Sequence, residues 1–324
     1  MKFLLIGLGS MGQRRIRCLT ALGHLNDITA YDIKPDRRTS AREKYGIEVV
    51  DDLSGIFDRK FDCMIISVPP DIHNVYIKKA IENNVPAFVE ASVVLGDLEE
   101  LNELAKKKGV FIAPSCTMLY HPSIKDIKSI IESKKYGKLT NFSYHSGQYL
   151  PDWHPWEKVT DYYVSNKLTG GGREIVPFEL TWIVDLIGFP KSVKGFYGKT
   201  MDVGADIDDT YTVCMDFGYC FGTLTVDVVS RYATRSLILN FEKGQVLWNW
   251  NEGQIKVYDA QEQRWIYYKN PAGTSVSGYN INKIDDMYIE ELKAFIDAIS
   301  DNAKYPNTLP KDIAVLKILL DIEK

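Results

Sequence analysis

Short apolar segments alternate with amphipathic segments over the first third of the chain. Brief apolar runs of this kind are typical of strands buried on both faces, and the segments between them repeat apolar residues at helical spacing. Strands that alternate with helices in this way predict an α/β fold with a doubly wound parallel sheet. The predicted strands are Phe3 to Ile6, Ile28 to Tyr31, Cys63 to Val68, Ala87 to Val89 and Val110 to Ala113, and the predicted helices are Met11 to Leu22, Asp36 to Tyr45, Asp71 to Asn83 and Leu98 to Lys108.

The pattern changes to two-residue alternation from about Leu139 onward. Alternation of apolar and polar residues is typical of strands with one buried face, so this part predicts an α+β domain with a large open, mostly antiparallel sheet. The apolar residues on one face of two such strands are Tyr211, Val213, Met215 and Phe217, followed by Leu224, Val226 and Val228.

Three signals complete the second half of the chain. Asn251-Glu252-Gly253 predicts a hairpin turn between two strands. Apolar residues at helical spacing from Ile284 to Ile299 predict one helix, and Pro310 opens another. We expect both helices to pack back toward the first domain.

The length of 324 residues corresponds to about two domains at roughly 150 residues each. The change of pattern places the division near residue 118. We therefore predict a first domain with the parallel sheet over 1–118 and a second, α+β domain over 119–324.

Composition narrows the function classes. A hydrophobic content of 45% with 25% charged residues excludes a disordered or fibrous chain. The formal charge of −4 favours neither a nucleic acid nor a membrane surface as partner. Five scattered cysteines predict reduced thiols and a cytoplasmic protein, and the absence of metal-ligand spacing among histidines and cysteines predicts no metal site.

The segment Gly7-Leu8-Gly9-Ser10-Met11-Gly12 has the pattern G-x-G-x-x-G between a predicted strand and a predicted helix. In dinucleotide-binding folds the first glycine permits a tight turn, and the second lets the pyrophosphate approach backbone N–H groups. The third lets helix and strand pack closely, and the helix N-terminus stabilises the anion. The segment therefore predicts a dinucleotide site.

Asp32 ends the next predicted strand, 20 residues (32 − 12) after Gly12. This is the expected distance for an acid that binds the adenosine ribose, and its charge repels a 2′-phosphate, so NAD is favoured over NADP. Arg37 and Arg38 follow closely and could accept a phosphate or stack on adenine. The alternative for Asp32 is a helix cap or turn residue.

Four features together resemble the glucose-fructose oxidoreductase / inositol dehydrogenase (Gfo/Idh/MocA) family. They are the glycine fingerprint, Ser67-Val68-Pro69-Pro70-Asp71-Ile72-His73, Phe88-Val89-Glu90-Ala91-Ser92 and Gly170-Gly171-Gly172. The resemblance covers nearly the whole chain and implies an NAD(P)-binding Rossmann domain over 1–118, followed by a substrate and oligomerisation domain with an open sheet over 119–324. It also implies cofactor contacts from Ser67, Val68, Pro69 and Glu90, and it places His73 near the nicotinamide; a helix cap is the other role open to His73.

Two departures from this family concern catalysis. The family motif Glu-Lys-Pro is replaced by Glu90-Ala91-Ser92, so the lysine beside the substrate carbinol is missing. The family's Asp-x-x-x-His pair on the helix after the triple glycine is also missing, because Val176 and Glu179 or Leu180 stand near those positions. The resemblance therefore implies a divergent member with a non-standard proton donor.

Glu179 and Lys167 are two candidates for managing the proton. A carboxylate inside a helix that faces a pocket acts as a general base when desolvation raises its pKa. The alternative for Glu179 is a surface carboxylate or a partner of Arg173. Lys167 could replace the missing ammonium, and its alternative is an ordinary solvated lysine.

The segment 144–163 contains six aromatic residues in twenty, against 12% aromatic residues in the whole chain. Aromatic faces beside Asp, His and Glu suit a sugar, which packs its C–H face on a ring. His154 in this segment could exchange a proton near neutral pH. The alternative is that Tyr149, Trp153 and Trp156 fill a loop core or a subunit contact.

We therefore expect an NAD(H)-dependent oxidoreductase that acts on a secondary alcohol or carbonyl of a sugar-like or nucleotide-sugar-like small molecule. The alternative is a nucleotide-binding sensor or regulatory protein of the same fold without dehydrogenase turnover. An open sheet that buries its second face on another subunit predicts a homodimer or homotetramer.

Overall fold

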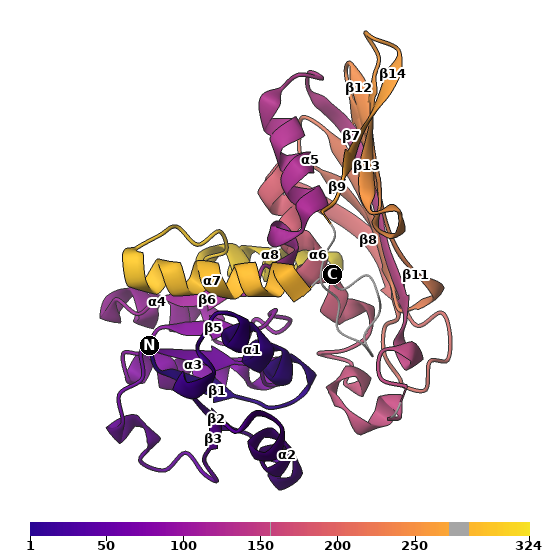
Figure 1. Ribbon diagram of the computed structural model, residues 1–324. Coiled ribbons are helices and arrows are strands. Elements are labelled where there is room, and N and C mark those ends of the chain that lie inside the picture. Colours follow the sequence, from indigo (N-terminus) through magenta and orange to yellow (C-terminus); the bar gives the residue numbers. More distant parts are fainter. Residues whose placement is uncertain (156, 272–284) are drawn as a thin grey trace. The chain divides into compact units, whose positions relative to one another are not determined.

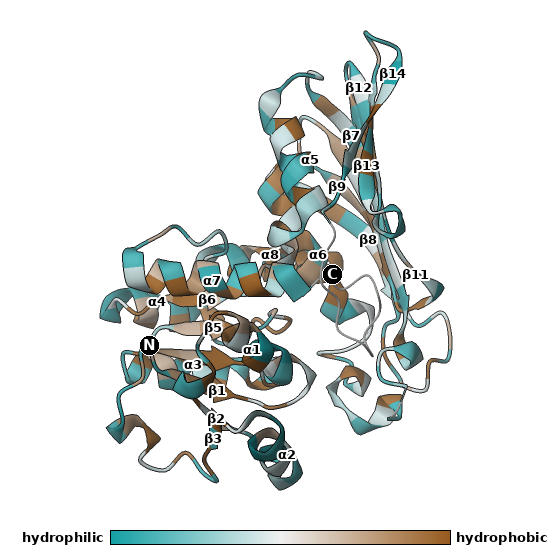
Figure 2. Cartoon of the chain, in the orientation of Figure 1, coloured by the Kyte–Doolittle hydropathy of each residue, from teal (hydrophilic) through white to brown (hydrophobic). Residues whose placement is uncertain are grey.

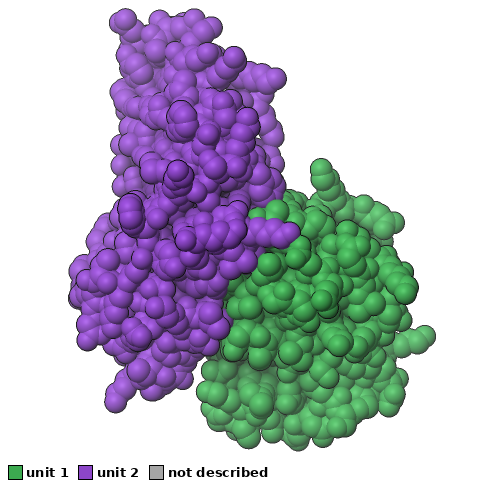
Figure 3. Space-filling view, turned by 180° about the vertical axis from the view of Figure 1, so that it is seen from behind, with its two compact units in different colours: residues 1–117, 285–314 green, residues 118–284, 315–324 purple. Residues whose placement is uncertain are grey.

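The computed structural model describes residues 1–155, 157–271 and 285–324, so Trp156 and the predicted helix start at Ile284 lie outside the described residues. The chain forms two compact units, which Figure 3 colours separately. Unit 1 contains residues 1–117 and 285–314, and unit 2 contains residues 118–284 and 315–324.

Unit 1 is built on a six-stranded sheet in which all strands run parallel (Figure 1). The strand order is β3-β2-β1-β4-β5-β6, so the direction of the winding reverses between β1 and β4. In sheets of this kind, dinucleotides bind at the carboxyl ends of the strands at the reversal point. The strands are β1 (Phe3–Ile6), β2 (Ile28–Tyr31), β3 (Glu48–Val49), β4 (Cys63–Ile66), β5 (Ala87–Val89) and β6 (Ile112–Pro114).

Helices connect the strands of unit 1. Amphipathic helices of this kind bury their apolar side chains against the sheet or another helix. Helix α1 packs against α7, and α3 packs against α4. Helix α2 is mostly hydrophilic in Figure 2 and buries only Ala41. The α-helices are α1 (Ser10–Ala21), α2 (Pro35–Tyr45), α3 (His73–Glu82), α4 (Leu98–Lys108) and α7 (Asp285–Asp301), and the short 3-10 helices are η1 (Leu25–Asp27), η2 (Ile56–Asp58) and η3 (Pro70–Ile72).

The predicted parallel α/β sheet is confirmed, and β1, β2, β5 and α4 have the predicted bounds. Strand β3 was not predicted, because two residues at a sheet edge carry no apolar run. The predicted helix over 71–83 is wrong in its first turn, which is the 3-10 helix η3. Pro69 and Pro70 explain this, since proline restricts the backbone of this turn and lacks an N–H donor.

Unit 2 is built on an eight-stranded sheet with the order β14-β13-β12-β11-β7-β10-β9-β8. Among the described strands of this sheet, only β7 and β10 pair in parallel, so the predicted mostly antiparallel sheet is confirmed. The strands are β7 (Leu139–Tyr149), β8 (Ser192–Gly198), β9 (Thr210–Asp216), β10 (Phe221–Asp227), β11 (Val229–Phe241), β12 (Gly244–Asn249), β13 (Gln254–Asp259) and β14 (Arg264–Lys269).

One face of this sheet carries the core of unit 2. Apolar residues of α5 (Pro122–Ser133), α6 (Gly172–Ile187) and the end of α8 (Leu309–Ile322) pack with the inward residues of the strands. The predicted alternation is correct, since Tyr211, Val213 and Met215 are fully buried. The connecting 3-10 helices are η4 (Thr117–Tyr120), η5 (Leu150–Asp152), η6 (Val159–Asp161), η7 (Tyr163–Ser165) and η8 (Trp250–Glu252).

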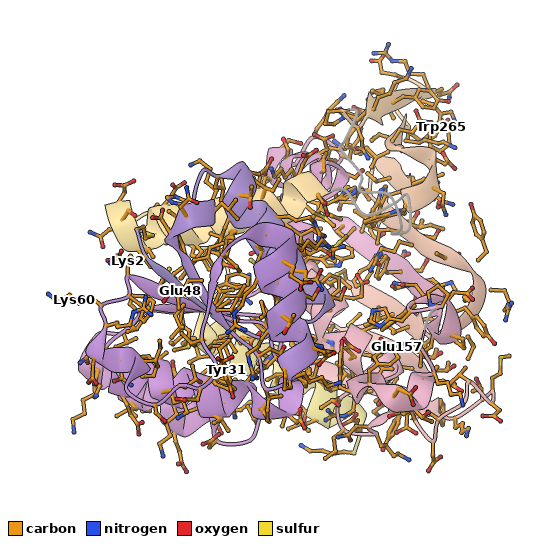
Figure 4. All side chains as sticks on the ribbon, turned by 60° about the horizontal axis from the view of Figure 1, so that its bottom comes forward. Lys2, Tyr31, Glu48, Lys60, Glu157 and Trp265 are labelled. Carbon is orange, nitrogen blue, oxygen red and sulfur yellow. The ribbon has the colours of Figure 1, made fainter. Side chains whose placement is uncertain are left out.

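The opposite face of the sheet is open and carries exposed aromatic side chains. Phe196 is 88% exposed and Phe221 is 67% exposed, and Trp265 and Tyr267 of β14 are also exposed (Trp265 is labelled in Figure 4). Phe196, for example, lies opposite the polar residue Thr212 of β9, so its side chain is on the face away from the core. No helix in the described part of the chain has the length and apolar character that a bilayer span requires.

Candidate functional site

The glycine loop connects β1 to α1 in unit 1, and its three glycines have different packing requirements. A Cβ on Gly12 would collide with the carbonyl of Gly7, and a Cβ on Gly7 would collide with the carbonyl of Ser67, so the fold itself requires these two. A Cβ on Gly9 would meet only the flexible Arg37 guanidinium at 3.2 Å. The space above Gly9 is therefore not filled by the fold, as expected where a pyrophosphate approaches the backbone.

Helix α1 begins at this loop with an N-terminus suited to an anion. Gly9 is the N-cap and makes no side-chain cap, and the first turn contains no acidic residue. The N–H groups of a first helical turn need acceptors, and together with the helix dipole they bind phosphate groups. Ser10 and Met11 form this turn, so the loop fits the pyrophosphate of a dinucleotide.

Asp32 lies just after β2 and is 5% exposed. Its Oδ2 accepts the backbone N–H of Leu8 at 2.7 Å, and its Oδ1 accepts the N–H of Lys34 at 2.8 Å. These two bonds fix the carboxylate beside the glycine loop. The N-cap of α2 is Lys34, so Asp32 is not a helix cap. Its bond to the Lys34 N–H two residues on is the contact of a turn residue, and the same carboxylate can accept hydrogen bonds from ribose hydroxyls, so both of these interpretations fit the position.

Arg37 and Arg38 have different interaction partners. Arg37 Nη1 lies 3.6 Å from the Asp32 carboxylate and next to Gly9. Arg38 instead binds Asp51 and the carbonyls of residues 32 and 33. The structure therefore leaves Arg37, rather than Arg38, beside the expected position of the adenosine.

The carboxyl ends of β4 and β5 meet at Ser67 and Glu90. Ser67 Oγ donates to Glu90 Oε1 at 3.0 Å. His73 is 2% exposed and its Nε2 bonds the carbonyl of Val68 at 2.9 Å, which ties α3 to the loop Ser67-Val68-Pro69. Burial lowers the pKa of His73, so its imidazole is neutral and anchors this loop instead of capping α3.

Arg15 was not among the predicted site residues, yet it connects three parts of unit 1. It is completely buried, binds both Glu90 oxygens at 2.7 and 2.8 Å, and donates from Nη1 to Glu291 of α7 at 2.9 Å. The sequence carries a signal for this arrangement. Arg15 falls between Gly12 and Leu19 on the apolar stripe of its helix, and a charge on such a stripe predicts a buried partner.

Glu179 lies in the middle of α6 in unit 2 and is completely buried. It accepts hydrogen bonds from Tyr144, Ser146, Trp182 and Arg235 at distances between 2.7 and 3.0 Å. Its partner is therefore Arg235 and not Arg173, which instead binds Glu323, and the alternative of a surface carboxylate is wrong. Four donors on one carboxylate favour a buried anchor for Arg235 over a base that exchanges protons with a substrate.

His154 follows η5 and is partly exposed, at 21% of its side chain. Its Nδ1 lies 2.6 Å from Oε1 of Glu157, which Figure 4 labels, and its ring stacks on Tyr162 at 4.7 Å. A carboxylate beside Nδ1 holds the imidazole ring in one orientation.

Lys167 is 60% exposed, and its Nζ lies 3.5 Å from the carboxylate of Asp208. Such a distance between exposed groups gives a weak, solvated ion pair. These surroundings match the alternative of an ordinary solvated lysine. Glu179, His154 and Lys167, the three predicted catalytic residues, each have different partners in the structure.

The aromatic segment has its own small core in unit 2. Tyr149, Trp153 and Tyr163 pack against buried apolar residues that include Leu150 and Val164. The loop-core alternative therefore describes Tyr149 and Trp153, and Trp156 lies outside the described residues. Tyr162, stacked on His154, remains partly exposed.

Another cluster that was not predicted lies near Arg235. His121 stacks on Trp250 at 4.7 Å, and the Arg235 guanidinium lies 4.8 Å from the same indole ring. Burial lowers the pKa of His121 to about 3, so it stays neutral and its Nδ1 accepts the N–H of Ser123. Such long-range contacts depend on strand register, which local patterns do not determine.

Two models of known protein families match the chain. Residues 1–115 match the model of an oxidoreductase family with an NAD-binding Rossmann fold, and residues 124–247 match the Gfo/Idh/MocA C-terminal domain. The chain belongs to the Gfo/Idh/MocA oxidoreductase family. Among proteins with curated descriptions, no match to the sequence was found.

Solved structures share the fold of this Gfo/Idh/MocA chain at low identity. An oxidoreductase from Agrobacterium radiobacter in complex with NAD+, L-tartaric acid and magnesium has a TM-score of 0.86 at 13% identity, covering 100% of this chain and 95% of that chain. A levoglucosan dehydrogenase with NADH and levoglucosan gives 0.85 at 16%, with coverage of 100% and 96%. A putative NADPH-dependent oxidoreductase from Desulfitobacterium hafniense gives 0.81 at 15%, with 98% and 93%.

This Gfo/Idh/MocA member carries a buried acid at its altered motif. Ser92 and Asn307 hydrogen-bond the carboxyl of Asp312, which is 3% exposed, and burial raises its pKa to about 6. Ala91 between Glu90 and Ser92 has no proton to exchange. Within residues 1–155, 157–271 and 285–324, no group of three metal-ligating side chains is placed to hold an ion.

Proposed function

We propose that this protein is an NAD(H)-dependent oxidoreductase that acts on a secondary alcohol or carbonyl of a sugar-like small molecule. The observation that carries the proposal is the Asp32 carboxylate, fixed by Leu8 and Lys34 beside the space above Gly9. The glycine loop would hold the pyrophosphate and Asp32 the adenosine ribose. NAD, when bound, supplies the hydride acceptor or donor.

NAD is preferred over NADP in this proposal because the buried Asp32 carboxylate repels a 2′-phosphate. Arg37 lies close enough to offset part of that repulsion, at 3.6 Å from Asp32. One solved structure that shares this fold is described as a putative NADPH-dependent oxidoreductase, so both dinucleotides need to be compared in the binding test.

His154 is our proposed proton-exchanging residue, with Glu157 as the group that orients it. Hydride transfer to a carbonyl requires one proton on the resulting oxygen, and an imidazole can supply or take that proton. The contact of 2.6 Å between His154 and Glu157 supports this assignment. Glu179 would act only indirectly, by holding Arg235.

The sugar-like substrate class is supported by the exposed part of Tyr162 beside His154 and by the fold relative that binds levoglucosan. The second candidate function is a nucleotide-binding sensor without turnover. Ala91 in place of the family lysine favours this candidate, because the chain then lacks the usual proton donor.

The test follows NADH absorbance while the protein is mixed with a panel of sugars, keto-sugars and their nucleotide-linked forms. We expect saturable NADH binding and oxidation with at least one carbonyl compound of this panel. Binding without oxidation across the panel would support the sensor, and absence of binding would overturn both functions.

A further inference from the structure

Unit 1 contains a buried charge cluster that the proposed function leaves unexplained. We define the Arg15 triad as Arg15, Glu90 and Glu291. The side chains of Arg15 and Glu291 are 0% exposed, whereas the side chain of Glu90 is 12% exposed. One positive and two negative charges give the triad a net charge of −1, and only Glu90 reaches the surface.

The triad joins the carboxyl ends of three neighbouring strands. Ser67, just after β4, donates to Glu90, which itself follows β5. Ser115 and Thr117, after β6, donate to Glu291 at 2.8 and 2.9 Å. Since Asp32 follows β2 on the other side of the reversal point, a dinucleotide with its adenosine there extends its nicotinamide half toward β4 and β5.

The hydrogen bonds show which member of the triad can still bind a ligand. Both oxygens of Glu291 accept two donors each, from Ser115 and Cys116 on Oε1 and from Thr117 and Arg15 on Oε2. Within the part of the chain that the structure describes, Glu90 Oε1 accepts Arg15 Nε and Ser67, but Glu90 Oε2 accepts only Arg15 Nη2. A carboxylate oxygen has two lone pairs, so Glu90 Oε2 retains one acceptor position.

We propose that Arg15 and Glu291 are positioning residues that hold the Glu90 carboxylate toward the nicotinamide half of the dinucleotide, and that the net charge of the triad sets the preference between oxidised and reduced cofactor. This inference rests on the proposed function, because it requires a bound nicotinamide dinucleotide. The oxidised ring carries a positive charge and the reduced ring is neutral. A fixed anion nearby therefore strengthens binding of the oxidised form relative to the reduced form.

Glu291 has a distinct part in this arrangement. Alone, the Arg15 and Glu90 pair would be neutral and would exert little field on the ring. Glu291 restores the negative charge without using any acceptor position of Glu90. Burial by itself lowers the pKa of Arg15, but Glu90 and Glu291 together raise it, so the guanidinium stays charged and the geometry is maintained.

The experiment compares dissociation constants for NAD+ and NADH in variants of the full chain, by calorimetry and by NADH fluorescence. Glu90→Gln and Glu291→Gln each remove one negative charge and keep the side-chain shape. We expect each to raise the ratio of the NAD+ to the NADH dissociation constant by about threefold to tenfold. Arg15→Lys keeps the charge but loses the bidentate geometry, so it should weaken both forms alike and leave the ratio near that of the wild type.

Glu323→Gln is the matched control, because Glu323 forms a similar pair with Arg173 in unit 2. It should leave the ratio unchanged, and melting curves confirm folding of every variant. An unchanged ratio in both Glu90→Gln and Glu291→Gln, with NAD+ and NADH still bound, would overturn this inference and leave the proposed function standing. Loss of all dinucleotide binding in the wild type would instead overturn the proposed function.

Discussion

The carboxylate of Asp32 accepts the backbone N–H of Leu8 at 2.7 Å, and this bond ties the end of β2 to the glycine loop after β1. Two elements of the proposed dinucleotide site are thereby fixed to each other: the acid proposed for the ribose and the backbone proposed for the pyrophosphate. Position 91, where Ala91 replaces the family lysine, takes no part in this arrangement of Asp32 and the glycine loop. Cofactor binding and catalysis can therefore be tested separately.

Replacement of Asp32 tests the ribose contact. Asp32→Ala should weaken NAD+ binding by about tenfold to a hundredfold, because charge-assisted hydrogen bonds are worth about 1.5–3 kcal/mol each. NADP+ should be weakened less, since the repulsion of the 2′-phosphate is removed. Calorimetry with both dinucleotides measures this, with Glu103→Gln on the exposed face of α4 as control. Equal losses for both dinucleotides would contradict the role of the Asp32 charge.

Replacing Gly12 by alanine should mainly lower stability, whereas replacing Gly9 by alanine should mainly weaken dinucleotide binding. Gly12→Ala should cost at least about 2 kcal/mol of folding free energy, because its Cβ would collide with the carbonyl of Gly7. Gly9→Ala should change stability by less than about 1 kcal/mol, since only the flexible Arg37 is near, but it should greatly weaken NADH binding. Denaturant unfolding and fluorescence titration measure the two effects. Normal NADH affinity in a folded Gly9→Ala variant would argue against this loop as the pyrophosphate site.

His154 and Glu179 differ in what their replacement should change. His154→Gln should lower kcat by about a hundredfold with little effect on NADH affinity, as expected for a general acid or base. Glu179→Gln should instead lower stability by about 3 kcal/mol, because it leaves the partly buried Arg235 without its charge partner. Steady-state kinetics and thermal unfolding distinguish them. Full activity of His154→Gln would exclude His154 as the proton donor.

Asp312 predicts a pH dependence of stability. Its pKa is about 6 in the folded chain, above its ordinary value of 3.8, so the folded state binds more protons between these values. Asp312 therefore contributes stability below about pH 4, and this contribution is lost as the pH rises through 6. The stability of Asp312→Asn relative to the wild type should then increase by about 2–3 kcal/mol from pH 4 to pH 8. Asp301→Asn, at the exposed end of α7, should show no such change, and a flat difference for Asp312→Asn would contradict the assignment.

The open face of the unit 2 sheet predicts self-association. Phe196, Phe221 and Trp265 expose aromatic surface on that face, and apolar patches of this kind commonly mark interfaces. We expect a homodimer or homotetramer, and Phe221→Lys should shift it toward smaller species in sedimentation. Sedimentation of the wild type as a monomer only would contradict the prediction.

Local patterns in the sequence predicted most of unit 1, because short apolar runs and helical periods are local properties. The segment 98–108 was predicted to the residue, and the spacing of Gly12 and Asp32 led to the proposed dinucleotide site. The partners of the buried charges could not be predicted. Glu179 meets Arg235 from 56 positions away, through a strand register that no local pattern determines.

Calorimetric titration of the purified chain with NAD+ tests the central claim most directly. We predict saturable heat with one site per chain, and loss of most of that heat in the Asp32→Ala variant. A wild-type titration that shows no heat of binding at millimolar NAD+, together with no change in NADH fluorescence, would contradict the dinucleotide site on which the proposed activity depends.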